Sequence, residues 1–451
     1  MPNTKPTNVI WIFGDQHRGQ ALSCNGDPNV STPNLDRLAD NGVCFPRAVS
    51  GSPLCCPFRG SLLTSRYPHQ CVPGHELPLP RNLPTIAQAF GDHGYQTAWF
   101  GKWHLGGFHE RDGRAAFYTV PPEDRGGFDT WIGYDNNNDQ WDCWVHGHDG
   151  TGGEIERYRL PGYETDSLTD LLIAHLREQA QARRAGRGVP FFAALSVQPP
   201  HDPYVASAAF MDRHNPQSLI LRPNVPAVAR VQEQARRELA GACAMIENLD
   251  FNVGRVLEAL AGEGLAQDTL IVYFSDHGDM HGSHGHFRKT SPYEESIRVP
   301  FIIAGGPSRY ACRHGRPAAP INHVDIAPTT LGLCGIEKPA WMDGYDYSGL
   351  FRPGELPADQ PDSAYLQSVI PTRHGDSIDR PWRGVVTRDG WKYVCLEQQP
   401  WLMFNLNEDS FEQVNLAHNT AFGAERKRLH ACLANWVAKT GDTFALPDLG
   451  E

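Results

Sequence analysis

The run Asn8–His17, NVIWIFGDQH, begins with apolar side chains and ends in polar ones. This pattern predicts a short buried strand that carries polar groups at its carboxyl end. The chain repeats the pattern in three more strands, predicted over residues 96–100, 190–197 and 269–274. Ligands of open parallel sheets bind at the carboxyl ends of the strands. The residues we expect to meet at one such edge are Asp15, Lys102, His201 and Asp276.

Helical patterns separate these predicted strands. Thr32 is placed to cap a helix that Gly42 ends, and residues 166–185 form a clearly amphipathic pattern. Strands that alternate with helices predict an α/β fold, with a mainly parallel sheet covered by helices on both faces. The remaining predicted elements are a strand over residues 299–304 and helices that begin at Cys55 or cover residues 83–93, 227–264 and 325–335.

Residues 106–165 show no sustained period and are rich in Gly, Asp, Asn, His and Trp. A loop region of this length is either functional or disordered, and its aromatic residues favour an ordered, substrate-facing insertion. These side chains either stack against an aryl ring or sugar face or only pack the loop. They are Trp131, Tyr134, Trp141, Trp144 and His146.

The pattern changes again near Pro353. Two predicted strands, residues 383–387 and 391–396, flank the turn signal Arg388-Asp389-Gly390, and a third covers residues 402–406. A helix over residues 425–438 follows. We therefore expect a catalytic α/β domain over residues 1–352 and a smaller domain, an antiparallel sheet plus a helix, over residues 353–451.

Composition narrows the classes of partner and compartment. The chain has 451 residues and a net charge of −12, which argues against nucleic acid or an anionic membrane as a partner. The apolar run over residues 9–13 is too short for a secretory signal or a membrane span, and no other segment is long enough to cross a bilayer. The eleven cysteines show no paired spacing. We expect a cytoplasmic protein with reduced thiols.

Two of the predicted strand ends offer ligands for a cation. Asp15 and Gln16 follow the first strand, and Asp276 and His277 follow another. Oxygen donors with one imidazole suit Ca²⁺, Mg²⁺ or Mn²⁺ better than a thiolate-bound zinc. A zinc-protease site through His277 and His281 is rejected, because no Glu follows His277 and nearby glycines interrupt the required helix.

Other charged and ionisable residues suit the hydrolysis of an anionic ester. Arg59, Lys102 and Lys289 are candidate anion clamps, and His104 and His201 are candidate proton carriers. Such hydrolysis needs neutralised charge on the non-bridging oxygens, an activated nucleophile and an acid for the leaving oxygen. The predicted sheet edge offers all three.

Cys55 opens the segment CCPFRGSLLTS, with Pro57 two places on and Arg59 four places on. This spacing resembles the activation motif of type I sulfatases, in which a separate enzyme oxidises the cysteine to formylglycine. The resemblance implies that the hydrated aldehyde at Cys55 attacks sulfur with one hydroxyl and uses the other to expel sulfate. Cys56 stands in the wrong register for this motif. The alternative is a buried structural cysteine.

The resemblance extends over nearly the whole chain. The segments Phe100–Gly106, Ser275–Asp279 and Tyr293–Pro300 are similar to family landmarks. Shorter matches are Thr32–Leu38, His323–Thr329 and Phe404–Asp409. Membership implies an alkaline-phosphatase-like α/β fold, a mixed but mainly parallel sheet flanked by helices with a smaller C-terminal subdomain.

The resemblance also implies roles for individual residues. Cys55, as formylglycine, is nucleophile and metal ligand together, and Arg59 steadies its hydrate. Lys102 and Lys289 hold sulfate oxygens. His201 acts as acid on the leaving oxygen, and His104 takes a proton from the remaining hydroxyl. The implied metal ligands are Asp15, Gln16, Cys55, Asp276 and His277, around one divalent cation, Ca²⁺ first and Mn²⁺ or Mg²⁺ as alternatives.

The chain departs from the common family pattern at three positions. Gln16 stands where many members have a second Asp, and His277 where many have Asn; both are similar to the branch of phosphonate monoester hydrolases and some arylsulfatases. The missing carboxylate leaves the identity of the cation open. Ser65 replaces the glycine that usually ends the activation motif.

We expect a hydrolase that releases inorganic sulfate and an alcohol from a small-molecule or saccharide sulfate ester. Its expected partner in maturation is a formylglycine-generating enzyme acting on the nascent chain, with no nucleic acid and no membrane; an oligomer is not excluded. One alternative is a phosphonate monoester or phosphodiester hydrolase with the same site. An alternative of another class is an unconverted, non-catalytic anion- or glycan-binding protein.

Overall fold

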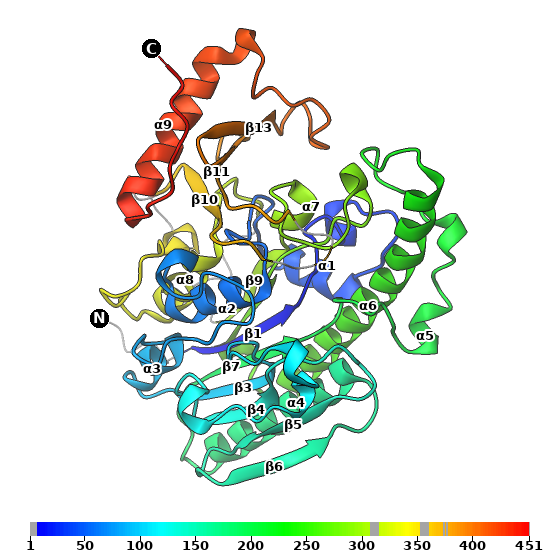
Figure 1. Ribbon diagram of the computed structural model, residues 1–451. Helices are drawn as coiled ribbons and strands as arrows, with labels where there is room; N and C mark the ends of the chain where they lie inside the picture. Colours follow the sequence, from blue (N-terminus) through cyan, green and yellow to red (C-terminus); the bar gives the residue numbers. More distant parts are fainter. Residues whose placement is uncertain (1–6, 307–314, 352–359, 373–374, 376–377, 451) are drawn as a thin grey trace.

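The central part of the larger sheet consists of parallel strands, as the sequence predicts. The computed structural model describes residues 7–306, 315–351, 360–372, 375 and 378–450. The sheet has nine strands in the order β2-β9-β8-β1-β7-β3-β4-β5-β6 (Figure 1). The strands that end in the predicted polar clusters are adjacent and parallel. They are β8 (Thr269–Ser275), β1 (Asn8–Gly14), β7 (Phe191–Val197) and β3 (Gln96–Lys102).

Antiparallel strands extend this sheet at both edges. On one side β9 (Phe301–Gly305) and β2 (Gly42–Cys44) follow β8. On the other side β4 (Thr130–Tyr134), parallel to β3, is followed by β5 (Trp144–His148) and β6 (Glu154–Arg159). The expectation of an irregular segment over residues 106–165 was therefore wrong. These strands are short, and glycines and polar residues within and between them hide their period.

Helices cover both faces of the large sheet. In β1, Val9, Trp11 and Phe13 join one hydrophobic core, whereas Ile10 and Ile12 join the other. The first core contains α2 (Cys55–Thr64), α3 (Ile86–Gly91) and α8 (Ile326–Cys334). The second contains α1 (Pro33–Asp40), α4 (Glu164–Arg184) and α6 (Ala229–Gly262). The short helix α5 (Ala208–Met211) packs on α6, whereas α7 (Glu294–Ile297) contributes Ile297 to the cluster against the small sheet.

The predicted helices lie within a few residues of the observed ones. The helix predicted over residues 83–93 is shorter, because Thr85 and Gln88 form a capping box at its start and it ends at Gly91. None of the helices that the structure describes is long and apolar enough to cross a membrane.

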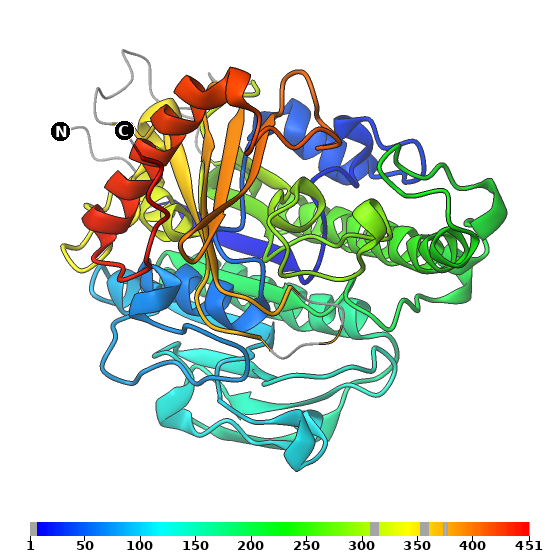
Figure 2. The ribbon, with the colours of Figure 1, turned by 45° about the horizontal axis from the view of Figure 1, so that its top comes forward.

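The C-terminal part is a four-stranded antiparallel sheet with one long helix, as predicted. Helix α9 (Gly423–Thr440) packs on one face of this sheet, and the other face contacts Val49 and Ile297 of the large domain (Figure 2). The predicted boundary at residue 352 lies outside the described residues. The strands are β10 (Ser363–Ser368), β11 (Trp382–Thr387), β12 (Trp391–Leu396) and β13 (Gln399–Asn405).

A buried lysine on β12 ties the small sheet to the large domain. Lys392 Nζ donates hydrogen bonds to the carbonyl oxygen of Pro292 at 2.9 Å and to Glu294 Oε1 at 3.0 Å, and it also pairs with Glu412. Burial opposes its charge, but the two carboxylates outweigh this effect and raise the pKa of Lys392. The ammonium group therefore stays charged where β12 meets α7.

We expect Lys392→Met to lower the free energy of unfolding by about 3–5 kcal/mol, because it leaves buried carboxylates without a counter-charge. Urea unfolding measures this loss. The exposed Lys427 offers a matched control, and Lys427→Met should change stability by no more than about 0.5 kcal/mol. Equal stability of both variants would mean that Lys392 does not hold the sheets together.

Candidate active site

The ends of the four parallel strands meet, as the sequence predicts. Asp15 and Asp276 follow the adjacent strands β1 and β8, Lys102 ends β3, and His201 lies in the turn after β7. Lys102 Nζ donates to Asp15 Oδ2 at 2.6 Å. The backbone of Gly101, at a φ of 102°, approaches the carbonyl oxygen of Ser196 so closely that a Cβ atom would lie 2.0 Å from it. Only glycine allows this turn into Lys102.

Cys55 lies beside the two carboxylates. Its Sγ is 3.6 Å from Asp15 Oδ1 and 3.3 Å from His277 Nε2. It is the first residue of α2, a helix whose residues are all buried. The unpaired N–H groups and the positive dipole end of a helix favour negative charge at this position. A group at residue 55 thus faces the carboxylates from an electropositive helix end.

Four side chains form a compact group of candidate metal ligands. Asp15, Cys55, Asp276 and His277 each offer one ligand atom, and these atoms all lie within 4.8 Å of one another. His277 Nδ1 lies 3.0 Å from the carbonyl oxygen of Gly278 and donates to it, which leaves the Nε2 lone pair toward the carboxylates. Burial keeps the pKa of His277 below its ordinary value, so the imidazole is neutral and can bind a cation.

Gln16 is the fifth predicted ligand, and its amide is held in a fixed orientation. Its Nε2 donates to Asp279 Oδ2 at 2.6 Å and to the Tyr204 hydroxyl at 3.1 Å, with Asp202 Oδ1 at 3.3 Å. Its Oε1 is buried and accepts no hydrogen bond from the described residues. An unpaired buried carbonyl oxygen is costly unless it finds a partner, so this atom fits a cation ligand. Sequence reasoning gave no role to the three residues that orient it.

Arg59 joins both carboxylates. One of its terminal nitrogens, Nη2, lies 3.5 Å from Asp15 Oδ2 and 3.4 Å from Asp276 Oδ2. The other terminal nitrogen, Nη1, donates to Ser196 Oγ at 2.8 Å and to the carbonyl oxygen of Lys102 at 2.9 Å. Ser196 was not among the predicted site residues, because its only signal in the sequence is a hydroxyl within the apolar run of β7. The guanidinium is therefore fixed by groups in or directly after four strands, β1, β3, β7 and β8.

Lys289 and His201 form a pair beside Cys55. Lys289 Nζ donates to His201 Nε2 at 2.8 Å and lies 3.1 Å from Cys55 Sγ. His201 Nδ1 donates to the carbonyl oxygen of Asp202 at 2.7 Å. Burial and the charge of Lys289 lower the pKa of His201 to about 3. His201 is consequently neutral, with Nε2 as an acceptor from Lys289.

The centre carries more positive than negative charge. Arg59, Lys102 and Lys289 surround the carboxylates of Asp15 and Asp276. Burial alone would raise the pKa of Asp15, but the nearby charges, Lys102 first, hold it well below its ordinary value. The local field therefore attracts anions, although the whole protein has a net charge of −12.

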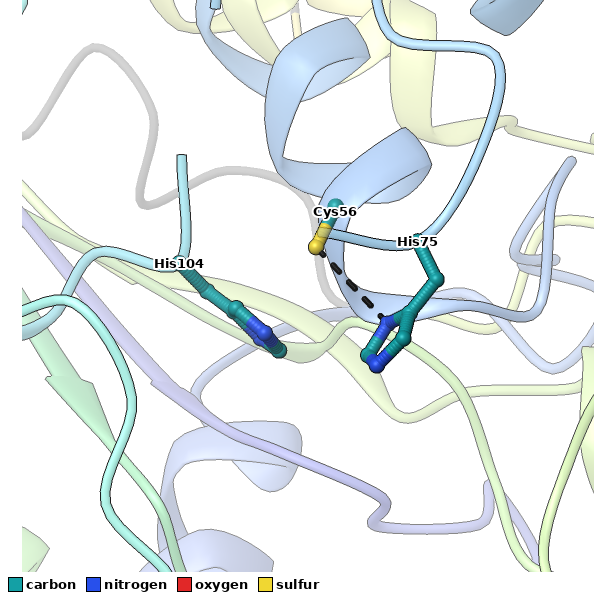
Figure 3. Close-up of side chains that lie close together, drawn as sticks. All are labelled: Cys56, His75 and His104. Carbon is teal, nitrogen blue, oxygen red and sulfur yellow. Dashed lines mark hydrogen bonds between the residues drawn. The ribbon is translucent and has the colours of Figure 1, made fainter. Parts of the chain in front are cut away.

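His104 lies apart from the candidate metal ligands, on the side of Cys56. Its ring packs edge-on against His75, with centroids 5.4 Å apart, and Figure 3 shows both rings near the Cys56 side chain. Neither ring nitrogen of His104 has a hydrogen-bond partner among the described residues, although the side chain is buried. Burial and Lys102 hold its pKa well below the ordinary value, so the ring is neutral.

The aromatic residues of the segment 106–165 serve mainly in packing. Trp131 and Tyr134 are fully buried, and His146 Nε2 accepts the backbone N–H of Val120 at 2.9 Å. Trp144 is half-buried against Phe117. Only Trp141, 42% exposed, remains open to a substrate among the aromatic residues named for stacking.

Comparisons with known proteins agree on one family. The family model described as "Sulfatase" matches residues 7–336, and that described as "N-sulphoglucosamine sulphohydrolase, C-terminal" matches residues 282–439. An ulvan-active sulfatase of Formosa agariphila is 35% identical over 451 residues, which cover 99% of this chain and 83% of that protein. The crystal structure of a putative sulfatase from Bacteroides fragilis matches with a TM-score of 0.85 at 26% identity, over 98% of both chains.

A further solved structure extends the likeness of the fold. It is a protein in complex with its substrate D-glucosamine-2-N,6-O-disulfate, and it matches with a TM-score of 0.84 at 22% identity. The match covers 97% of this chain and 99% of that one.

If the carboxylates hold a divalent cation, Ca²⁺, Mn²⁺ or Mg²⁺ added to chelator-treated protein should raise the melting temperature, because it binds the folded state alone. Thermal unfolding with and without each ion measures the shift. We expect Asp276→Asn to abolish it. The control is Asp92→Asn at an exposed position, which should retain the full shift. A shift that survives in Asp276→Asn would place the ion elsewhere.

Proposed function

Because this chain belongs to the sulfatase family and is an enzyme that hydrolyses sulfate esters, we propose that its nucleophile is Cys55 oxidised to formylglycine. The observation that carries this proposal is the position of Cys55 at the electropositive start of α2, with its Sγ 3.3 Å from His277 Nε2 and 3.1 Å from Lys289 Nζ. A buried cysteine with a purely structural role does not need such neighbours. The spacing to Arg59 supports the same choice over Cys56.

We propose Ca²⁺ as the cation, with Mn²⁺ and Mg²⁺ as alternatives. The residues that would hold it fit a hard cation, because they offer carboxylate oxygens, the unpaired Oε1 of Gln16 and one neutral imidazole. When bound, the cation would lower the pKa of a hydroxyl at residue 55 and neutralise charge on a sulfate oxygen. The proposed ligands are Asp15, Gln16, residue 55, Asp276 and His277.

The basic residues are proposed to bind the sulfate group. Lys102 and Lys289 approach residue 55 from different strands and loops, so their ammonium groups can hold different non-bridging oxygens. Arg59 is bound by Ser196 and both carboxylates, and this fixed position suits a group that steadies residue 55. Preorganised donors of this kind stabilise developing charge without reorganising during the reaction.

Two histidines are proposed to handle protons. His201 and Lys289 are hydrogen-bonded to each other beside residue 55, so we assign this pair to give the leaving alcohol its proton. His201 is neutral, and its Nε2 accepts a hydrogen bond from Lys289. The transferable proton of the pair is therefore on Lys289 Nζ. We assign His104, neutral and unpaired, to take the proton from the hydroxyl of residue 55 as sulfate is released.

A saccharide is the proposed carrier of the sulfate. A cavity of about 280 Å³ is lined by polar groups, among them Arg114, Asn137, Asn138 and Asp139. Asn138 Oδ1 accepts from Gln198 Nε2 at 3.1 Å, which connects the cavity wall to the turn that holds His201. Amides, a carboxylate and a guanidinium suit sugar hydroxyls. The substrates in the names of the relatives support the same class.

Two further proposals concern the maturation of Cys55 and the compartment of the protein. The Cys55 motif is proposed as the target of a formylglycine-generating enzyme. All the cysteines within the described ranges are free, which supports a reducing compartment, and we propose the cytoplasm.

Mass spectrometry of the peptide that contains Cys55 should show a residue lighter by the fixed difference between cysteine and formylglycine. Cys55→Ala should abolish turnover and leave the fold intact, because it removes the nucleophile and no core volume beyond one sulfur atom. Cys56→Ala is the matched control and should retain most of the activity. An unmodified Cys55 in protein that still turns over sulfate esters would overturn the proposal.

Paired aryl substrates distinguish sulfate from phosphonate hydrolysis. In a phosphonate monoester, carbon replaces one of the oxygens that Lys102, Lys289 and the cation would hold. The loss of one preorganised contact costs about 10²–10³-fold in rate, so we expect kcat/KM for the aryl sulfate to exceed that for the phosphonate by a factor on this order. A faster phosphonate reaction would reverse this assignment.

A further inference from the structure

A second group of metal-binding side chains adjoins the catalytic centre. Cys56, His75 and His104 each offer one ligand atom, and these atoms lie within 4.8 Å of one another. Figure 3 shows the Cys56 side chain between the two rings, with Sγ 3.9 Å from His75 Nδ1. In a tetrahedral zinc site, sulfur and nitrogen ligands lie about 3.5 Å apart. The observed separation of Sγ and Nδ1 exceeds this value by only a few tenths of an ångström, and His75 is partly exposed.

The donor set differs from that of the catalytic centre. One sulfur and two imidazoles prefer Zn²⁺ and other soft or borderline cations, whereas the carboxylates of Asp15 and Asp276 prefer Ca²⁺ or Mg²⁺. The two neighbouring groups therefore differ in the cation that each prefers.

The surroundings of the group are those of a metal site. The backbone N–H of Glu76 donates to Cys56 Sγ at 3.3 Å, so a backbone contact fixes the position of the sulfur. The Glu76 carboxylate lies 4.0 Å from His75 Nε2, while His75 Nδ1 faces the sulfur. The third member, His104, is 4% exposed, and both of its ring nitrogens lack partners within the described chain.

We propose that Cys56, His75 and His104 bind Zn²⁺ and that this binding inhibits the enzyme. The ion displaces the thiol proton of Cys56, which passes to solvent, and the three side chains leave its fourth position to water. His104 then no longer has a basic nitrogen, because one ring nitrogen binds the ion and the other carries a proton. The inhibition rests on the proposed role of His104 as proton acceptor, but the binding does not.

Cobalt(II) provides a direct readout, because a cobalt–thiolate bond gives a charge-transfer absorption. In a Cys55→Ser background, which removes the neighbouring thiol, Co²⁺ added with excess Ca²⁺ should produce this band at one equivalent. Adding Cys56→Ser should abolish it. Absence of the band in the Cys55→Ser protein, or its persistence without Cys56, would overturn the site. The result does not depend on turnover, so it is distinct from a failure of the proposed function.

Inhibition is measured in the active enzyme with Ca²⁺ in excess. Zn²⁺ should inhibit the wild type, and Cys56→Ser and His75→Gln should each raise the half-inhibitory concentration at least about tenfold. His75→Gln lies at a partly exposed position, so it serves as the test if the buried Cys56→Ser fails to fold. Equal inhibition of wild type and both variants would place the inhibitory ion at the catalytic carboxylates and would overturn the proposal.

Discussion

The structure depends on the contact of one buried guanidinium with two buried carboxylates. Arg59 extends from α2 to Asp15 and Asp276, the residues that follow the neighbouring strands β1 and β8. Its second terminal nitrogen, Nη1, donates hydrogen bonds to Ser196 Oγ and to the carbonyl oxygen of Lys102. Buried charges are tolerated only when they are paired and hydrogen-bonded. The arginine therefore fixes the distance between the helix that carries Cys55 and the sheet that carries the carboxylates.

The same contacts explain how an acidic protein can act on an acidic substrate. Three basic side chains lie beside two carboxylates in the buried centre. Positive charge therefore exceeds negative charge where the sulfate group must bind. Charge at the surface is screened within about 8–10 Å by physiological salt. The field at the site is therefore set by its immediate neighbours, and the overall charge of −12 has little influence there.

The sequence predicted the elements whose pattern is local. Strand β12 was predicted with its observed ends, and α4 and α6 within two residues, because each shows one clear period or turn signal. The meeting of four strand ends also followed from the sequence, since parallel strands share one edge. Strands β4–β6 and β10 were not predicted, because their side chains are stabilised by neighbours distant in the chain and their own pattern is weak.

The sequence motifs named most of the residues that the structure brings together around Cys55, but they did not name every residue that positions them. Ser196 contacts Arg59, a residue far away in the sequence, and nothing beside it in the chain marks such a contact. Asp279 lies in a recognised motif, but its contact with Gln16 is visible only in three dimensions. Gln16 illustrates what a sequence motif cannot show, namely how the side chain of a proposed ligand is oriented. The motif indicated a ligand, but only the three-dimensional structure reveals that Asp279 and Tyr204 hold its amide nitrogen and leave its oxygen free.

Helix α2 is enclosed on every side, and Cys55 at its start is only 1% exposed. No oxidising enzyme can reach that sulfur once the helix has docked. If formylglycine forms here, the fraction of active protein depends on two rates. One is the rate at which Cys55 is oxidised in the unfolded segment, and the other is the rate at which folding buries it. A molecule that folds first keeps its thiol for as long as it stays folded.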